Sequence, residues 1–475
     1  MTNNYHSYGE LKSGLKNGDT TVEKLVNGYL QQIQANVQLN AFNEVFAAEA
    51  LEQARALDKR MQSGGPVGKL AGMVIGIKDN ISYKGHKVTA SSKMLENFTA
   101  IYSATIVERL LAEDAIIIGR CNCDEFAMGA ANENSFFGPV KNYADQTRVS
   151  GGSSGGSALA VQAGMCHAAI GTDTGGSVRQ PAAFCGVVGL KPTYGRISRY
   201  GIISYASSFD QVGPITRSVQ DAALLLEVMA GPDEYDSTLA HKPVPQIANL
   251  KKESGKKRIA YMQEALSSPG VDADVKATLT AYIDKLRADG HTVKPISFEL
   301  LDYLVPTYYI LAMAEASSNL ARYDGVHYGY RSPNAVDLTS TYKKSRSEGF
   351  GKEVKRRIML GTFVLSAGYY DAYYAKAQRV RRLIQNKTNE ILQEYDFILA
   401  PTAPEPAFAL GLKEKDPVVT YLYDIFTVQA SLAGVPAISL PAGNNSKGLP
   451  LGLQLIAKSF NEQELLNFSE YFLQL

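Results

Sequence analysis

Two glycine-rich segments constrain this chain more than any other feature. The first is S-G-G-S-S-G-G-S at 150–157, and the second is G-T-D-T-G-G-S at 171–177. Glycine adopts positive φ angles and lets other backbone approach closely, so each segment can turn sharply and direct several N–H groups at one point. The residues between them favour a helix at 158–163 and a strand at 167–170. The pattern therefore predicts two tight loops around a helix–strand unit, with backbone able to bind a phosphate or an oxyanion.

Strands and helices alternate along the rest of the 475 residues, and no linker or repeat interrupts them. This alternation predicts an α/β fold with a single large domain over 1–475, whose central mixed, mostly parallel β-sheet is covered by helices on both faces. Residues 329–352 are too polar to assign. Strands are expected at 73–77, 115–119, 257–262, 291–297, 397–400, 437–440 and 451–456. Helices are expected twice within 20–62, and at 103–113, 178–184, 219–230, 272–289, 307–323, 353–395, 424–433 and from 461.

Composition limits the partners of the chain. Its 48 basic and 47 acidic residues leave a net charge of +1. A nucleic-acid-binding chain usually carries a basic excess, so any such role is assigned to a partner. The N-terminus has no signal or presequence and no apolar run approaches about 18 residues, which predicts a cytoplasmic protein without membrane contact. No metal site is predicted, because the C-x-C pair lacks further ligands, and all the cysteines are interpreted as free thiols: Cys121, Cys123, Cys166 and Cys185.

The serines of the first loop allow two interpretations. G-S-S-G-G at 152–156 matches the nucleophile elbow G-x-S-x-G with Ser154 as nucleophile. That mechanism needs a later histidine, and none has motif context: His167, His241, His291 and His327. The alternative base is Lys78, which ends an apolar strand and extends its amine to solvent, pairs with a neighbour such as Asp79, or is buried. Burial lowers a lysine pKa by roughly 3–5 units, so a buried amine can take a proton from serine at neutral pH. Nucleotide-binding glycine motifs are absent.

The second interpretation matches a known family. Lys78 in G-I-K-D, Ser153 in the first loop and Ser177 in G-T-D-T-G-G-S-V-R-Q-P-A resemble the amidase signature family, including its spacing of 24 residues between the serines. The resemblance implies that Ser177 is the nucleophile, that Ser153 relays its proton from a cis peptide, and that Lys78 is the base. It also implies an amidase core at about 65–230 and a helical insertion at about 300–395.

The resemblance further implies an oxyanion hole in the second loop. Its donors would be the backbone N–H groups of Thr174, Gly175, Gly176 and Ser177, and the glycines would let consecutive amides converge. Asp173 and Arg179 flank this loop. They would either brace it or form an ordinary surface ion pair.

Several further motifs are similar to those of one branch of the family, the A subunits of glutamyl-tRNA(Gln)/aspartyl-tRNA(Asn) amidotransferases. This branch implies a glutaminase that releases glutamate and ammonia. It places Arg357 on the α-carboxylate of glutamine and Asp424 on the ammonium, with Tyr308 nearby. Without the resemblance, Arg357 would be interpreted as a solvated helix charge and Tyr308 as a core or interface aromatic. The motifs are D124-E-F-A-M-G, E133-N-S-F-F-G-P, G186-V-V-G-L-K-P-T-Y-G, S207-S-F-D-Q-V-G-P, E315-A-S-S-N and Y423-D-I-F-T.

The same branch implies partners. B and C subunits would complete a heterotrimer, a carbon–nitrogen ligase with glutamine as amido donor. ATP, Mg²⁺ and the misacylated Glu-tRNA(Gln), with Asp-tRNA(Asn) as a second candidate, would bind mainly to the B subunit, and this chain would hold no cofactor. Some positions depart from the branch: Ser150 replaces proline, Ala130–Ala131 replaces a more polar pair, and Ser431 replaces asparagine. The alternative is a stand-alone amidase-signature hydrolase of small amides.

Overall fold

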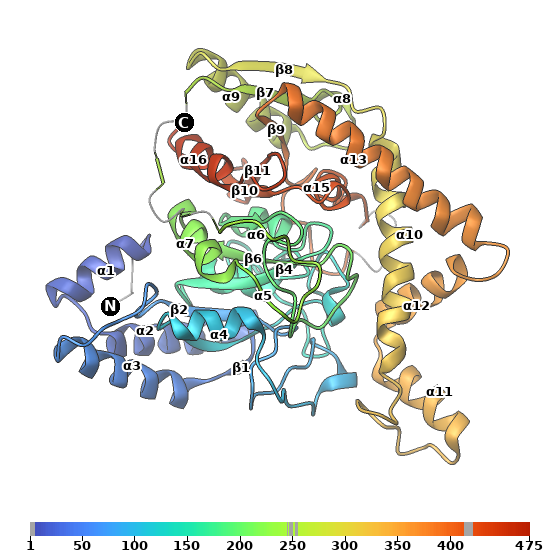
Figure 1. Ribbon diagram of the computed structural model, residues 1–475, viewed down its shortest axis with the longest axis horizontal. Helices are drawn as coiled ribbons and strands as arrows, with labels where there is room; N and C mark the ends of the chain where they lie inside the picture. The colour runs from blue at the N-terminus through green and yellow to red at the C-terminus, as the bar shows by residue number, and fades with distance from the viewer. Residues whose placement is uncertain (1–4, 245, 247–249, 252–254, 413–420) are drawn as a thin grey trace.

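One eleven-stranded sheet organises the molecule (Figure 1). The computed structural model describes residues 5–244, 246, 250–251, 255–412 and 421–475. The strand order is β1-β3-β2-β4-β6-β5-β10-β11-β9-β7-β8. The strands are β1 (Phe42–Val45), β2 (Val74–Lys78), β3 (Ile116–Cys121), β4 (Ala168–Asp173), β5 (Val188–Lys191), β6 (Gln211–Thr216), β7 (Arg258–Met262), β8 (Thr292–Ile296), β9 (Phe397–Pro401), β10 (Ala437–Asn444) and β11 (Pro450–Ile456).

Helices flank this sheet, which confirms the predicted α/β class. The α-helices are α1 (Tyr8–Asn17), α2 (Val22–Ala35), α3 (Ala47–Gln62), α4 (Thr105–Ala112), α5 (Gly155–Gln162), α6 (Arg179–Cys185), α7 (Val219–Met229), α8 (Glu264–Ser267), α9 (Ala273–Ala288), α10 (Leu301–Asn319), α11 (Leu338–Gly349), α12 (Lys352–Val364), α13 (Lys376–Glu394), α15 (Val428–Ala433) and α16 (Glu462–Phe472). Short 3₁₀ turns are η1 (Val37–Leu39), η2 (Lys93–Leu95), η3 (Glu125–Ala127) and η4 (Leu320–Arg322), and η5 (Tyr370–Ala375) is π-helical.

The sheet is mixed as predicted, but the prediction that it is mostly parallel is wrong. In the described part of the chain, six of the ten strand pairings are antiparallel. Parallel groups β3-β2-β4 and β9-β7-β8 flank an antiparallel block made largely of β6, β5, β10 and β11. The reason is connectivity, because a parallel pair needs a long crossover and an antiparallel pair does not. Strands β10 and β11 are joined by the short turn 445–449, in which the Asn445 N–H donates to the Leu449 carbonyl.

Several elements differ from the predictions. The second of the two helices expected within 20–62 is shortened by strand β1, because Phe42–Val45 pairs with β3. The helix expected over 353–395 is broken between α12 and α13, where Gly368 has a φ of 86° and η5 follows. Strands β5 and β6 were not predicted, and the unassigned stretch 329–352 contains α11. The helix expected at 424–433 is shorter, since α15 begins at Val428.

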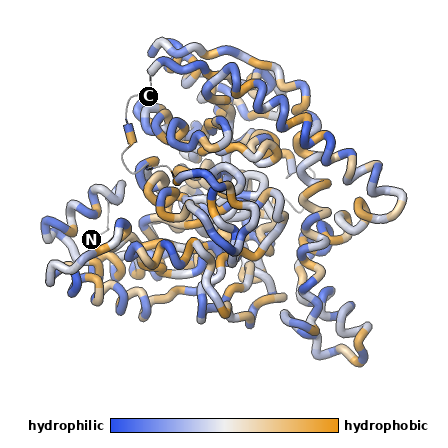
Figure 2. The backbone as a smooth tube through the Cα atoms, viewed as in Figure 1, coloured by the Kyte–Doolittle hydropathy of each residue, from blue (hydrophilic) through white to orange (hydrophobic). Residues whose placement is uncertain are grey.

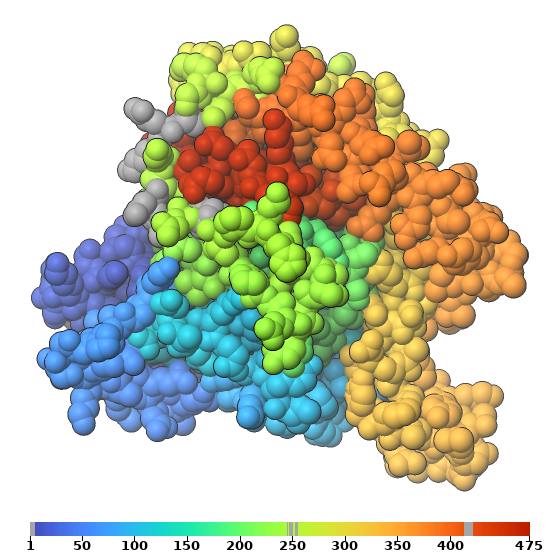
Figure 3. Space-filling model, in the orientation of Figure 1, coloured from blue at the N-terminus to red at the C-terminus, as the bar shows by residue number. Residues whose placement is uncertain are grey.

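Some helices of the C-terminal half gather at one side of the molecule. Figure 1 shows α10, α11 and α12 at the side opposite the N-terminal helices α1, α2 and α3. Figure 2 shows that hydrophilic residues dominate the long helix α13. Figure 3 shows the segment around α11 projecting from the surface. The N-terminal half supplies most of the sheet near the glycine-rich loops, and α10–α13 form a separate helical flank beside it.

The sheet positions the two glycine-rich loops. Strands β2 and β4 are parallel neighbours, with Ile77 opposite Ile170, so their carboxyl ends meet at one edge. Lys78 ends β2 and Asp173 ends β4. The first segment, 150–157, runs into the first turn of α5, and the second, 171–177, leaves β4 and leads to α6. The parallel pairing therefore brings the lysine to both loops.

Candidate active site

Lys78 lies at the centre of the site. Its side chain is fully buried at the end of β2. The Lys78 Nζ donates to Ser153 Oγ at 2.7 Å, to Ser154 Oγ at 2.9 Å and to Thr172 Oγ1 at 2.9 Å. Burial lowers the pKa of Lys78 to about 8. An amine with this pKa is partly neutral near neutral pH, so it can accept a proton from Ser153.

The two glycine-rich loops meet beside this lysine. The peptide bond between Gly152 and Ser153 is cis. The N–H of the next residue, Ser154, donates to the Ser177 carbonyl at 3.1 Å, which holds the second loop against the first. Ser177 is almost buried, with 8% of its surface exposed. The structure thus joins Lys78 to Ser153 directly and brings Ser177 to them through the backbone.

The backbone of the second loop offers unused donors. Among the described residues, no acceptor is found for the N–H groups of Thr174, Gly175, Gly176 and Ser177. Buried N–H groups are almost always paired, so four consecutive open donors indicate a place for a negatively charged oxygen. The glycines are required sterically. A Cβ on Gly175 would clash with the ring of Tyr308, and one on Gly176, whose φ is 142°, would clash with the side chain of Thr427.

Asp173 and Arg179 brace the second loop from within the protein. Both side chains are fully buried, and Arg179 donates to Asp173 from Nε and Nη2 at 3.0 Å each. Burial raises the pKa of Asp173, but the Arg179 guanidinium, together with Lys191 and the Val178 N–H, holds the pKa below its usual value. Asp173 also accepts from the Val178 N–H at 3.2 Å. The ion pair is therefore an internal brace and not a surface pair.

Arg179 extends the brace to the C-terminal part of the chain. Its Nη1 donates to the Thr427 carbonyl at 2.9 Å and to Gln454 Oε1 at 3.0 Å. Its Nη2 also donates to Ser431 Oγ at 3.2 Å, so the serine that replaces asparagine still accepts a hydrogen bond. Thr427 Oγ1 donates to the Gly175 carbonyl at 2.6 Å. Segments around 427 and 454 therefore hold the loop that carries the open donors.

The three residues assigned to glutamine lie together. Arg357 on α12 is buried, its Nη1 donates to Tyr205 OH at 2.8 Å, and it lies over the Tyr309 ring at 5.4 Å. The Tyr309 hydroxyl donates to Asp424 Oδ2 at 2.7 Å. Tyr308 packs against Gly175, as the steric contact above shows. The Tyr308 ring thus contacts the loop with the open N–H donors, and Arg357 and Asp424 are linked to each other through Tyr309.

Sequence reasoning missed several contributors to this group. Tyr309 links Arg357 to Asp424, and only its position next to Tyr308 could have indicated it. Glu353 accepts from Arg357 Nε at 3.0 Å, and its spacing of four residues on one helix was a usable signal. Thr427 is the last residue of the Y423-D-I-F-T motif, but no role was assigned to it. Tyr205 gave no signal of its own, because its hydroxyl reaches Arg357 from a distant loop.

The nucleophile-elbow interpretation of Ser154 finds no support in these contacts. Ser154 Oγ donates to the Thr172 carbonyl at 3.2 Å, and in the described part of the chain no histidine hydrogen-bonds to it. The buried His167 instead has Asp221 as its partner, at 2.8 Å. Ser154 is nevertheless more than a bystander, because it is one of the hydrogen-bond acceptors around Lys78.

Comparison with known proteins agrees with this geometry. The family model described as amidase matches residues 24–466. The chain belongs to the amidase family. A curated relative of this amidase, the A subunit of the glutamyl-tRNA(Gln) amidotransferase of Chlorobium phaeobacteroides, is 52% identical over 98% of each chain. The protein of the same name from Chlorobaculum tepidum is 50% identical over 98% of this chain and 97% of its own.

Solved structures of an amidotransferase A subunit and of a peptide amidase have the same fold as this amidase. The crystal structure of the corresponding A subunit from Thermotoga maritima superimposes with a TM-score of 0.77 at 40% identity, covering 94% of this chain and 90% of its own. The peptide amidase of Stenotrophomonas maltophilia superimposes with a TM-score of 0.81 at 29% identity, covering 98% and 95%. The amidase fold is therefore shared over nearly the whole length.

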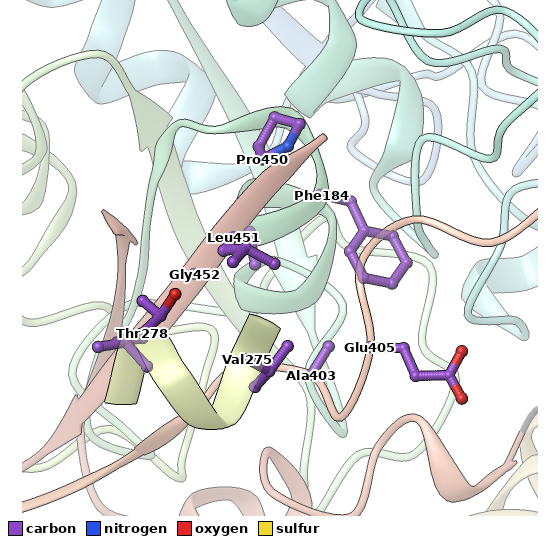
Figure 4. Close-up of a pocket in the computed structure, with 10 residues that line it drawn as sticks. Phe184, Val275, Thr278, Ala403, Glu405, Pro450, Leu451 and Gly452 are labelled. Carbon is purple, nitrogen blue, oxygen red and sulfur yellow. The ribbon is translucent and has the colours of Figure 1, made fainter. Parts of the chain in front are cut away.

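Other features of the amidase lie outside this site. Among the described residues, no group of three or more His, Cys, Asp and Glu side chains could hold a metal ion, and the four cysteines are buried free thiols. Of the described helices, none has the length and apolar character needed to cross a membrane. A cavity of about 10 Å³ next to Phe184 and Glu405 is lined by none of the site residues (Figure 4). It is too small for a substrate.

Proposed function

We propose that this chain is the glutaminase component, the A subunit, of a tRNA-dependent amidotransferase. The observation that carries the proposal is the buried Lys78 Nζ, 2.7 Å from Ser153 Oγ and beside a loop with four open N–H donors. The full-length relatives named as A subunits of glutamyl-tRNA(Gln) amidotransferase support the choice of branch. Within the chain, we assign the amidase core to about 65–230 and a helical insertion to about 300–395.

The proposed reaction proceeds through an ester. Neutral Lys78 takes a proton from Ser153 as Ser153 takes the proton of Ser177, and Ser177 Oγ attacks the side-chain carbonyl carbon of glutamine. The oxygen becomes an oxyanion held by the N–H groups of residues 174–177. The C–N bond then breaks, the proton returns through Ser153 to the leaving nitrogen, and ammonia departs. Each oxyanion donor of this kind contributes about 2.7–4 kcal/mol to lowering the barrier.

Water completes the cycle. It gives a proton to the same Ser153–Lys78 pair and attacks the glutamyl ester on Ser177, which releases glutamate and restores the serine hydroxyl. The chain's own side chains and backbone perform each of these steps. The lysine alternates between neutral and protonated forms, which suits a pKa of about 8.

The proposal assigns the two charged ends of glutamine to separate residues. Arg357 holds the α-carboxylate, since a guanidinium can donate to both oxygens. Asp424 accepts hydrogen bonds from the α-ammonium, and Tyr308 packs along the side chain. Two contacts of Tyr309 support this arrangement. Its ring lies under the Arg357 guanidinium and its hydroxyl donates to Asp424, so the cation and the anion stay near each other.

We further propose that ammonia passes to a B subunit, and that a C subunit completes a heterotrimer. The B subunit would use ATP and Mg²⁺ to activate the glutamyl group of Glu-tRNA(Gln), and Asp-tRNA(Asn) is a second candidate. A net charge of +1 is consistent with tRNA binding mainly through the partner. Because the proposed substrate is a tRNA, we propose that the assembly acts in the cytoplasm. The naming of a relative as one lettered subunit implies a complex of several subunits.

The test uses this chain expressed with B and C subunits. Ser177→Ala is expected to abolish both ammonia release from glutamine and conversion of Glu-tRNA(Gln) to Gln-tRNA(Gln), while externally added ammonium restores the tRNA reaction. His241→Ala, far from the motifs, is the control. Glutamine turnover near the wild-type rate in Ser177→Ala would contradict the mechanism. A chain that hydrolyses simple amides rapidly and ignores glutamine would establish the alternative, a stand-alone amidase.

A further inference from the structure

The loop Ser204–Asp210 connects parts of the site that the mechanism treats separately. It contains the motif S207-S-F-D, and a second motif, E315-A-S-S-N, packs against it from α10. Neither motif supplies a group to the proposed reaction. The loop forms no helix or strand and leads directly into β6.

The carboxyl end of this loop holds the oxyanion-binding segment. Asp210 is buried and its Oδ1 accepts from Thr174 Oγ1 at 2.7 Å. Its Oδ2 accepts from Ser204 Oγ at 2.8 Å and from the Tyr205 N–H at 3.0 Å. Thr174 carries the first of the four open N–H donors. Its side chain is therefore bound to the Asp210 carboxylate, which also binds Ser204 and Tyr205 at the start of the loop.

The amino end of the loop holds the residue assigned to the α-carboxylate. The Tyr205 hydroxyl accepts from Arg357 Nη1 at 2.8 Å. Between the two ends, Phe209 packs edge-on against the Tyr308 ring, with 5.6 Å between the ring centroids. One seven-residue loop thus contacts Thr174, Tyr308 and Arg357.

Two helices of the helical flank fix the outer side of the loop. On α10, Glu315 Oε2 accepts from the Ser208 N–H at 2.9 Å, and Asn319 donates to the Tyr205 carbonyl at 3.2 Å. On α13, Arg381 donates to Ser208 Oγ at 2.8 Å and to the Ser208 carbonyl at 2.9 Å. The Arg381 guanidinium also lies 4.0 Å from the centre of the Phe209 ring. Figure 1 shows both helices at the same side of the molecule.

We propose that the Ser204–Asp210 loop is a positioning element that sets the spacing between the oxyanion-binding backbone at Thr174 and the guanidinium of Arg357, and so selects the amide substrate by the length of its side chain. The inference rests on the proposed function, because it takes these two groups as the contacts for the two ends of glutamine. Arg381 and Glu315 act on the substrate only through the loop. The shorter asparagine is the natural comparison, since it carries the same α-groups and the same amide.

The decisive variant is Arg381→Gln in the chain assembled with its partner subunits. The measured quantity is kcat/KM for glutamine divided by kcat/KM for asparagine. Loss of the Ser208 contacts is expected to lower this ratio about five- to tenfold, the effect of one or two hydrogen bonds. Arg382→Gln is the matched control, because Arg382 is the next residue on α13 and is exposed. Partial unfolding would lower kcat for both amides equally and leave the ratio unchanged.

Two conservative variants separate the ends of the loop. Tyr205→Phe removes only the hydroxyl that Arg357 contacts, so KM for glutamine is expected to rise about five- to tenfold with kcat within about twofold. Thr174→Val removes only the hydroxyl that donates a hydrogen bond to Asp210. The kcat for glutamine is therefore expected to fall about five- to tenfold with KM little changed. A general loss of stability would not raise KM alone in one variant and lower kcat alone in the other.

The outcomes also distinguish this inference from the proposed function. Ser177→Ala and Arg357→Gln test the function by loss of glutamine turnover and by a raised KM for glutamine. If these behave as proposed while Arg381→Gln and Tyr205→Phe match Arg382→Gln in both KM and substrate ratio, the positioning role of the loop is wrong. If glutamine is not hydrolysed by the wild-type assembly, the function fails and the loop selects no glutamine.

Discussion

The reacting groups and the groups assigned to the substrate are built in different ways. Lys78 ends β2, Ser153 and Ser177 lie in the two glycine-rich loops, and the parallel pairing of β2 with β4 brings them to one edge of the sheet. Arg357 and Asp424 come from α12 and from the segment before α15, and tyrosines join them. The first region depends on backbone geometry that glycine permits. The second depends on side chains packed between separate segments.

This difference is expected to separate the residues that perform the reaction from the residues that select the substrate. The reacting region is nearly closed to solvent, and its hydrogen bonds are short and internal, so a substitution there is expected to act on kcat. The substrate region holds charges in place through aromatic rings and neighbouring carboxylates, so a substitution there is expected to act on KM. Measured kcat and KM can therefore break or sharpen the division.

The largest effect after loss of the nucleophile is expected at Lys78. Lys78→Met removes the base and is expected to lower kcat by about 10²- to 10⁴-fold, the usual contribution of a general base. In the wild type, kcat/KM for glutamine should rise with pH and level off above about pH 8, because only the neutral amine accepts a proton and burial lowers the Lys78 pKa to about 8. Rates measured from about pH 6 to about pH 10 test this. A flat profile would assign the base to another group.

An intermediate effect is expected at Arg357. Arg357→Gln should raise KM for glutamine about 10- to 100-fold, since hydrogen bonds to a charged group contribute about 1.5–3 kcal/mol. Butyramide, an aliphatic amide without the α-groups, should be hydrolysed at the wild-type rate. Lys355→Gln on the same helix is the control, because Lys355 is exposed. An equal loss for glutamine and butyramide would mean that Arg357 supports the chemistry and not the selection.

The smallest effect is expected at Ser154. Ser154→Ala removes one of the hydroxyls around Lys78 and should lower kcat no more than about tenfold, as for one hydrogen bond. Ser153→Ala is the matched comparison, because the two serines are adjacent and both contact the Lys78 amine. The proposed relay requires the Ser153 variant to lose far more activity. Equal losses in the two variants would remove the distinction between relay and support.

The residues of the reacting region could be predicted from the sequence because the patterns that mark them are local. Lys78 ends an apolar strand, and the serines sit in glycine-rich runs, so their identity and spacing could be recognised in a single chain. The α/β class followed from the alternation of elements. The direction of the strands did not, because the antiparallel block formed by β5, β6, β10 and β11 depends on pairing between residues up to about 250 positions apart, and no local pattern reports such pairing.

The substrate region was accessible only through the family resemblance. Arg357 on its own reads as one charge among several on α12, and nothing near Tyr205 or Tyr309 in the chain indicates contact with it. Burial and hydrogen bonding of these groups arise when α10, α12 and the 204–210 loop pack together. The same holds for Arg179, whose five acceptor contacts bring together segments from 173 to 454.

The brace at Arg179 has a consequence for protein synthesis. A growing chain that has just passed α7 already contains the lysine and both serines. It lacks Thr427, Ser431 and Gln454 on β11, which all follow much later in the chain. Three of the five Arg179 contacts that brace the 171–177 loop can therefore form only after most of the chain has been translated. We therefore expect an unfinished polypeptide to hold this loop less firmly and to release less ammonia from glutamine than the full chain.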